Sequence, residues 1–140
     1  MYERLLIAYD GSEGARKALE VGLGMARDDR AAVTVLAIEA HLPHYGATVG
    51  EVNEELEREE SESKALLEEA RALAATHDVP IETEIRAGHA AQTIVAVAKE
   101  NDADLIVIGH SGHSGVWGSL LGTTAERVSR HSDRSVLIVR

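Results

Sequence analysis

The segment ADLIVIGHSGHSGVWGSLLGTT, residues 103–124, runs from an aliphatic stretch through a glycine-rich loop to the expected start of a helix. Its unbroken LIVI run is typical of a parallel strand that is buried on both faces. Gly109, Gly112 and Gly122 follow with the spacing G-x2-G-x9-G, and two threonines come directly after the last glycine. Glycine lets main-chain N–H groups approach an anion closely, and a helix start adds further unpaired N–H groups. The segment therefore predicts a phosphate-binding loop at the carboxyl end of a buried strand.

The alternative interpretation is a loop that only connects two elements, because segments rich in glycine and serine are commonly connectors. A second feature favours binding. The apolar run near the beginning of the chain ends at Asp10-Gly11-Ser12, where Ser12 suits the N-cap of a following helix. Two predicted strands thus carry candidate binding groups at their carboxyl ends.

Hydrophobic periodicity predicts four strand–helix pairs and a last strand. The expected elements are strand 3–9, helix 13–27, strand 33–39, helix 52–77, strand 81–86, helix 90–100, strand 103–108, helix 123–132 and strand 135–139. Such alternation is typical of an α/β fold with one doubly wound, five-stranded parallel sheet and helices on both faces. Ligands of these sheets bind beyond the carboxyl ends of the strands, where the strand order reverses. We therefore expect Asp10 and the Gly109 loop to face one crevice.

Composition limits the classes of function. The chain has 140 residues, which suits a single domain over residues 1–140, and without Phe its core must be mainly aliphatic. The 24 acidic and 14 basic residues give a net charge of −10, which argues against nucleic acid and anionic membranes as partners. There is no cysteine, no signal-like beginning and no apolar run long enough to span a bilayer. We expect a cytoplasmic protein without membrane insertion.

An acidic stretch lies between the predicted second strand and the next helix. Seven glutamates between residues 51 and 62 are opposed only by Arg58, while Val52, Leu56 and Leu67 continue an apolar helical spacing beneath them. This pattern is typical of a solvated helix face. We favour that interpretation over a cation site made from these glutamates.

Histidines offer a second possible metal site. The pairs are His41 with His44 and His110 with His113, on loops that should share the carboxyl edge. Four imidazoles can hold a transition metal, but loop histidines without fixed geometry are usually solvated, which is the favoured interpretation. An Mg²⁺ or Mn²⁺ ion carried by nucleotide phosphates, with Asp10 or a loop hydroxyl as a further ligand, suits the sequence better.

Over its whole length the chain resembles the universal stress protein family, in its nucleotide-binding form. The family's phosphate motif matches at Gly109, Gly112, Gly122 and Thr123, and its first-strand aspartate matches at Asp10. The resemblance implies an adenine nucleotide alpha-hydrolase-like sheet of order 3-2-1-4-5 and ATP as ligand, with AMP or ADP as alternatives. It implies a binding site made of Ala8, Tyr9, Asp10, Ile38, Ile108, Gly109, Ser111, Gly112, Gly122, Thr123, Thr124 and Ala125.

The resemblance also implies a homodimer in which the last strands, Ser135 to Val139, pair antiparallel. This pairing has a physical motive, because an uncovered apolar edge strand promotes association. Higher oligomers and a regulated protein partner stay open.

No catalytic constellation emerges from the sequence. The missing lysine argues against a P-loop NTPase, and DGSEG does not fit a dinucleotide fingerprint. We predict an ATP-binding regulatory module of the stress response rather than an efficient enzyme. Slow hydrolysis, or self-phosphorylation on a hydroxyl, stays open; the candidate hydroxyls are those of Ser111, Ser114, Ser119 and Thr123. The alternative is a family member that binds no nucleotide and works through dimerisation and protein partners.

Overall fold

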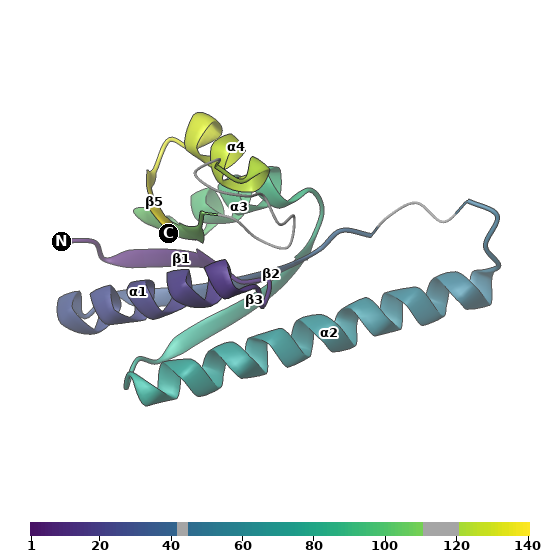
Figure 1. Ribbon diagram of the computed structural model, residues 1–140, viewed down its shortest axis with the longest axis horizontal. Coiled ribbons are helices and arrows are strands. Elements are labelled where there is room, and N and C mark those ends of the chain that lie inside the picture. Colours follow the sequence, from purple (N-terminus) through teal and green to yellow (C-terminus); the bar gives the residue numbers. More distant parts are fainter. Residues whose placement is uncertain (42–44, 111–120) are drawn as a thin grey trace.

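The computed structural model describes residues 1–41, 45–110 and 121–140, and it contains the predicted five-stranded sheet. All paired strands are parallel, and their order is β3-β2-β1-β4-β5. The elements are β1 (Arg4–Ala8), α1 (Glu13–Asp29), β2 (Ala32–Glu39), α2 (Val49–Thr76), β3 (Ile81–Ala87), α3 (Ala90–Glu100), β4 (Leu105–Gly109), α4 (Thr123–His131) and β5 (Ser135–Val139) (Figure 1). This arrangement confirms the predicted fold class and strand order.

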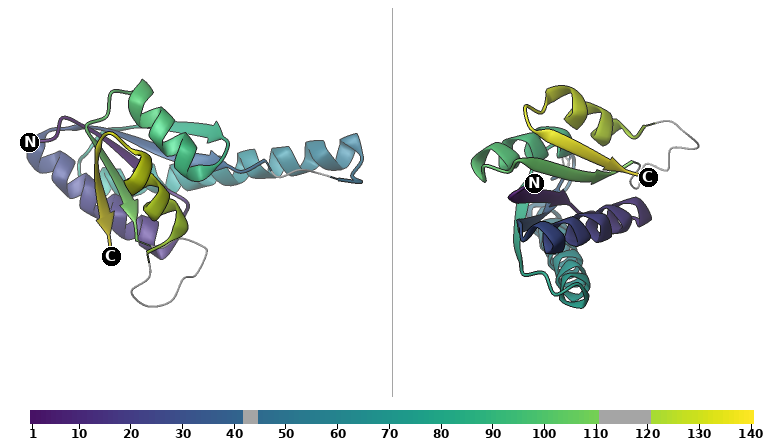
Figure 2. Two further views of the ribbon diagram at one scale, coloured as in Figure 1. Left: turned by 90° about the horizontal axis from the view of Figure 1, so that it is seen from above. Right: turned by 90° about the vertical axis from the view of Figure 1, so that its left-hand side faces the viewer.

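Two helices cover each face of the sheet (Figure 2). Helices α1 and α2 pack on the face that contains Ile7, Val35 and Val107, and helices α3 and α4 pack on the face that contains Leu6 and Ile106. These side chains are fully or almost fully buried. Because neighbouring residues of a strand point to opposite faces, a continuous aliphatic run such as LIVI fills both cores at once.

Helix α2 has 28 residues and extends beyond the sheet at its N-terminal end (Figure 1). Its buried residues, Ser63, Leu67, Ala70 and Ala74, all lie in its second half. Within the acidic stretch, all the glutamates except Glu55 and Glu59 are exposed, which confirms a largely solvated face. None of the helices in the described ranges is both long and apolar enough to cross a membrane.

Some boundaries differ from the prediction, and the physical causes are local. Helix α2 begins at Val49 rather than at residue 52, because Thr48 and Glu51 form a capping box. The T-x-x-E signal was present in the sequence. Strand β4 begins at Leu105 rather than at residue 103, since the preceding segment turns through Asp102, whose φ is 52°. Ser12 caps α1 as predicted.

Gly109 lies where β4 passes very close to the backbone of α1. A Cβ atom at Gly109 would lie 2.7 Å from the carbonyl carbon of Gly14 and 3.1 Å from the amide nitrogen of Ala15. Both contacts involve main chain, which cannot move aside cheaply. The glycine therefore has a packing reason to be there, in addition to its predicted part in a binding loop.

Asp104 joins the beginnings of β1 and β4. Its carboxylate accepts hydrogen bonds from the main-chain N–H groups of Glu3 and Arg4, both at 2.9 Å. Burial acts to raise the pKa of Asp104, but the main-chain hydrogen bonds outweigh it and hold this pKa below its usual value. The ionised carboxylate is therefore the form that stabilises the fold.

We predict that Asp104→Asn lowers the free energy of unfolding at neutral pH by about 1 kcal/mol, since an amide can accept only one of these hydrogen bonds well. A lowered folded-state pKa contributes stability above the unfolded-state value, about 3.9, and loses it as the pH falls through the folded-state value. The difference in the free energy of unfolding between wild type and Asp104→Asn should therefore become smaller in acid. Urea unfolding at several pH values measures it, and a pH-independent difference would contradict the ionic contribution.

Candidate functional site

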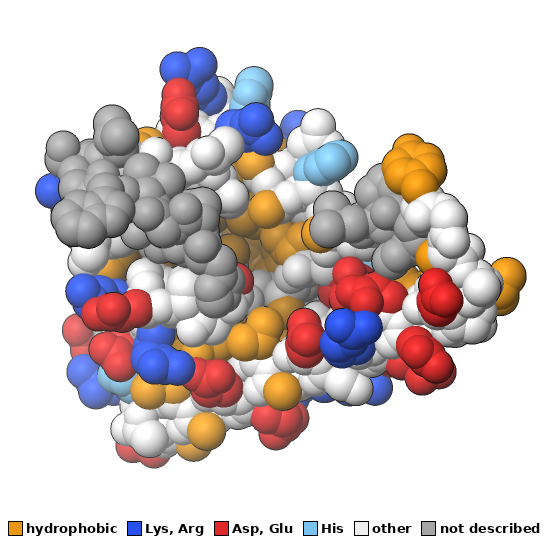
Figure 3. Space-filling view, turned by 45° about the vertical axis from the view of Figure 1, so that its right-hand side comes forward, with side chains coloured by type: hydrophobic (Ala, Val, Ile, Leu, Met, Phe, Trp, Pro, Cys, Tyr) orange, Lys and Arg blue, Asp and Glu red, His pale blue; other side chains and the backbone are white. Residues whose placement is uncertain are grey.

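A cavity of about 640 Å³ opens at the carboxyl edge of the sheet. The ends of β1, β2 and β4 and the starts of α1, α3 and α4 border it. In the space-filling view, hydrophobic side chains line a hollow in the middle of one face (Figure 3). A second cavity, of about 470 Å³, lies at the opposite edge among the first residues of β1, β2 and β3. The carboxyl-edge cavity is the candidate site, because ligands of doubly wound sheets bind there.

The floor of this cavity is apolar. Ala8, Leu36, Ile38, Ile94 and Ile108 line it, and all belong to or pack against the core on the α3/α4 face. Leu36, Ile94 and Ile108 are almost completely buried and so have fixed positions. A flat apolar group can lie on such a floor without leaving polar atoms unpaired.

Two helices begin at the cavity without a side-chain cap. Helix α4 starts after the N-cap residue Gly122 and helix α3 after His89, and in the described residues neither start donates a capping hydrogen bond to an N-cap side chain. Helices α1 and α2, by contrast, are capped by Ser12 and Thr48. Unpaired N–H groups and the positive end of the helix dipole favour anions at an uncapped start.

Hydrogen bonds hold together the two residues that flank the glycine-rich segment, His110 and Gly122. The N–H of Gly122 donates to the carbonyl of His110 at 2.9 Å, and the N–H of His110 donates to the carbonyl of Val139 at 2.7 Å. These contacts fix the start of α4 beside the end of β4. Thr123, Thr124 and the buried Ala125 of its first turn border the cavity.

Asp10 lies at the rim, directly after β1. Its Oδ1 accepts the main-chain N–H of Ser12 at 3.0 Å, so the carboxylate is oriented by its own turn. Gly11 between them has φ +79°, a backbone conformation that residues other than glycine rarely adopt. A Cβ atom at this position would lie 2.6 Å from the side chain of Leu66. The turn therefore holds the exposed carboxylate beside the apolar floor.

Tyr9 borders the cavity, but its ring belongs to the core on the α1/α2 face. Its hydroxyl donates to Glu69 Oε1 at 2.8 Å, and Glu69 also pairs with Arg16. Burial and the hydrogen bond with Glu69 raise the pKa of Tyr9, while the hydrogen bonds from Tyr9 and Arg16 lower the pKa of Glu69. The hydroxyl of Tyr9 is thus committed to α2 and not to a ligand.

The structure gathers most of the predicted site residues around this one cavity. Those that line it are Ala8, Tyr9, Asp10, Ile38, Ile108, Gly109, Gly122, Thr123, Thr124 and Ala125. Ser111 and Gly112 lie outside the described residues, as do Ser114, Ser119, His44 and His113. That these residues bind a nucleotide stays a prediction.

Sequence reasoning missed the contribution of the third strand. Gly88, His89 and Ala90, between β3 and α3, also line the cavity, as do Ala40 and His41 after β2. The signal was available, because the carboxyl ends of all parallel strands share one edge. Gly88 has φ +143°, which marks a sharp turn into α3.

Comparisons with known proteins agree with this architecture. The model of the Universal stress protein family matches residues 1–140. The universal stress protein YxiE of Bacillus subtilis is 32% identical over 151 residues, covering the full length of both chains. Among solved structures, the universal stress protein UspA from Lactobacillus plantarum has a TM-score of 0.90 at 27% identity, covering 99% of this chain and 98% of its own. A universal stress protein in complex with cAMP has a TM-score of 0.78 at 26% identity, covering 99% and 97%. The chain therefore belongs to the universal stress protein family.

Proposed function

We propose that this protein binds an adenine nucleotide, with ATP as the favoured ligand and ADP or AMP as alternatives, and acts as a regulatory module of the stress response. The observation that carries the proposal is the combination of an apolar floor with two uncapped helix starts in one cavity. A relative of known structure is in complex with cAMP, which supports an adenine ligand. The main support is the chemical fit between such a ligand and the residues of this chain that line the cavity.

The cavity offers a different kind of contact for each part of a nucleotide. A purine suits the floor of Ile38 and Ile108, ribose hydroxyls can donate to Asp10, and phosphates can accept from the start of α4 at Thr123 and Thr124. Charge-assisted hydrogen bonds contribute about 1.5–3 kcal/mol each, so a few supply much of the roughly 8 kcal/mol of micromolar binding. An Mg²⁺ or Mn²⁺ ion would enter with the phosphates, with Asp10 or a threonine hydroxyl within its reach as a ligand.

The competing function is a family member that binds no nucleotide and acts through association. Strand β5 lies at an edge of the sheet, and its residues from Val136 to Val139 are partly buried. An antiparallel partner strand would cover this edge, so we propose a homodimer under both functions. Nucleotide binding, and not dimerisation, therefore discriminates between them.

We expect adenine nucleotide to be released when the purified protein is denatured, which mass spectrometry would detect. We also expect MgATP to raise the unfolding temperature of nucleotide-free protein. The stabilisation should reach about 2.7 kcal/mol at a concentration a hundredfold above Kd. No bound nucleotide and no shift with ATP, ADP or AMP would favour the competing function.

Gly122→Val is expected to weaken ATP binding by about tenfold or more, because the added side chain would stand at the start of α4 where phosphates should lie. The φ and ψ of Gly122, −62° and 151°, suit valine, so the substitution adds no backbone strain at this buried position. Gly24→Val on α1 is the matched control, since a Cβ at Gly24 has no neighbour within 4 Å. Calorimetry measures both affinities. An equal loss of ATP affinity in Gly122→Val and Gly24→Val would count against binding of the phosphates at the start of α4.

Asp10→Ala should weaken the binding of adenosine by about tenfold, as expected for the loss of a hydrogen bond to a charged group. Its neighbour provides the control: Tyr9→Phe removes a hydroxyl that is committed to Glu69, so adenosine affinity should not change while stability falls. Calorimetric titration with adenosine and with ATP measures both variants. If Tyr9→Phe weakened adenosine binding more than Asp10→Ala did, the ribose would have to lie elsewhere.

A further inference from the structure

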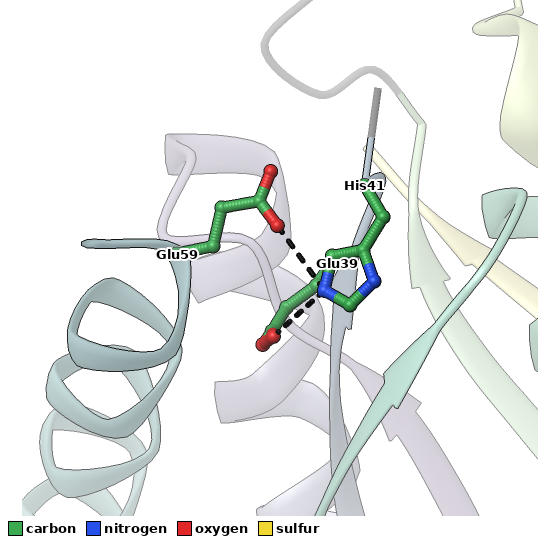
Figure 4. Close-up of side chains that lie close together, drawn as sticks. All are labelled: Glu39, His41 and Glu59. Carbon is green, nitrogen blue, oxygen red and sulfur yellow. Dashed lines mark hydrogen bonds and ion pairs between the residues drawn. The ribbon is translucent and has the colours of Figure 1, made fainter. Parts of the chain in front are cut away.

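A cluster of one histidine and two carboxylates lies on the β2 side of the cavity, where His41 is one of the lining residues and none of the three is among the residues predicted to bind the nucleotide. Glu39 ends β2, His41 follows it, and Glu59 reaches the same point from α2 (Figure 4). One ligand atom from each residue lies within 4.8 Å of the other two. A histidine nitrogen with two carboxylate oxygens is a donor set suited to a transition-metal dication.

The two distances from the histidine nitrogen are close to those between neighbouring ligand atoms of a metal site. His41 Nε2 lies 3.3 Å from Glu39 Oε1, a contact that also forms a long hydrogen bond, and 3.2 Å from Glu59 Oε2. A tetrahedral zinc ion with bonds of about 2.0–2.1 Å separates its ligand atoms by about 3.4 Å. Charge-assisted hydrogen bonds between nitrogen and carboxylate are shorter, at about 2.7–2.9 Å. The ring nitrogen is therefore spaced from both oxygens as a fellow ligand would be.

A buried carboxylate oxygen that accepts no hydrogen bond gives a second reason. Glu59 Oε2 is inaccessible to solvent and accepts no hydrogen bond, and among the described residues it shares this condition only with Glu84 Oε2. The Glu84 oxygen has the guanidinium of Arg86 at 3.2 Å, whereas Glu59 Oε2 has the imidazole nitrogen of His41 at 3.2 Å and Glu59 has no lysine or arginine ion pair in the described part of the chain. A desolvated carboxylate oxygen is costly unless a cation compensates it.

The carboxylate of Glu39 is already held in place. Its side chain is only 10% exposed, and its Oε2 accepts a hydrogen bond from Ser63 Oγ at 3.3 Å. Ser63 is the polar residue found fully buried in the described core. Hydrogen bonds of this kind orient metal ligands. His41, with 40% of its side chain exposed, leaves a path by which an ion could enter.

We propose that Glu39, His41 and Glu59 form a binding site for a Zn²⁺-type transition-metal dication, with an open position for water. Two carboxylates and one imidazole favour such an ion over Mg²⁺, which prefers oxygen ligands alone. The ion would join α2 to the end of β2 at the point where the helix leaves the sheet. This site differs from the solvated glutamates expected in that stretch, because the fold brings Glu59 to Glu39 and His41, which lie 20 and 18 positions earlier in the chain. It does not depend on the proposed nucleotide function.

The test is calorimetric titration of ZnCl₂ into the full chain at neutral pH, after removal of metal and nucleotide. We expect one saturable site per chain, whose occupancy raises the unfolding temperature and which excess Mg²⁺ does not displace. Glu59→Gln, which keeps the size of the side chain, should weaken binding by about tenfold or more. Glu57→Gln, an exposed neighbour on α2 with the same change of charge, should bind like wild type.

His41→Asn completes the experiment. Asparagine tolerates the left-handed backbone of His41, whose φ is 47°, so loss of binding would report the imidazole and not the fold. The exposed His131→Asn is its control. Zinc binding that survives in both Glu59→Gln and His41→Asn would overturn the site. So would binding that His110→Ala abolishes while Glu59→Gln retains it, since the ion would then lie on the histidines of the loops.

Discussion

The parallel pairing of β1 with β4 is the interaction on which the site depends. Leu5, Leu6 and Ile7 are in register with Leu105, Ile106 and Val107, and β2 occupies the other side of β1. The chain therefore leaves the ends of β1 and β4 in opposite directions, and a cavity opens between the two departures. The same pairing brings the end of β4 onto the backbone of α1, a contact that only glycine at position 109 permits.

Anion binding in this cavity would rely on main-chain groups. No lysine or arginine of the described residues lines it, and the chain carries a net charge of −10. The starts of α3 and α4 are then the main sources of positive potential, and they act at short range. The negative net charge of the protein would repel an anionic ligand at long range. This repulsion does not prevent binding, because salt screens it beyond about 8–10 Å.

Hydrophobic periodicity predicted the order and type of the nine elements found in the described residues, because burial on one or both faces leaves a regular pattern in the sequence. The positions of Gly122 and Thr123 at the cavity were also predictable, since they follow from where a strand ends and a helix begins. Side-chain partnerships between distant elements were not predictable in this way. The hydrogen bond from Tyr9 to Glu69 and the meeting of Glu39 with Glu59 depend on how α2 crosses the sheet, which no local pattern encodes.

The cavity is electrically asymmetric, and this asymmetry determines how a ligand could lie in it. The acidic cluster of Glu39, His41 and Glu59 stands on the β2 side, whereas the uncapped start of α4 stands on the β4 side. A phosphate group beside this cluster would meet like charge, which opposes the attraction of the uncapped start of α3, whereas at the start of α4 it would meet unpaired N–H groups away from the cluster. The apolar floor between them has no preference of its own. A nucleotide would therefore be oriented by its two ends, with the uncharged base toward β2 and the phosphates toward α4, and a cation held by the acidic cluster would weaken that orientation by neutralising one end.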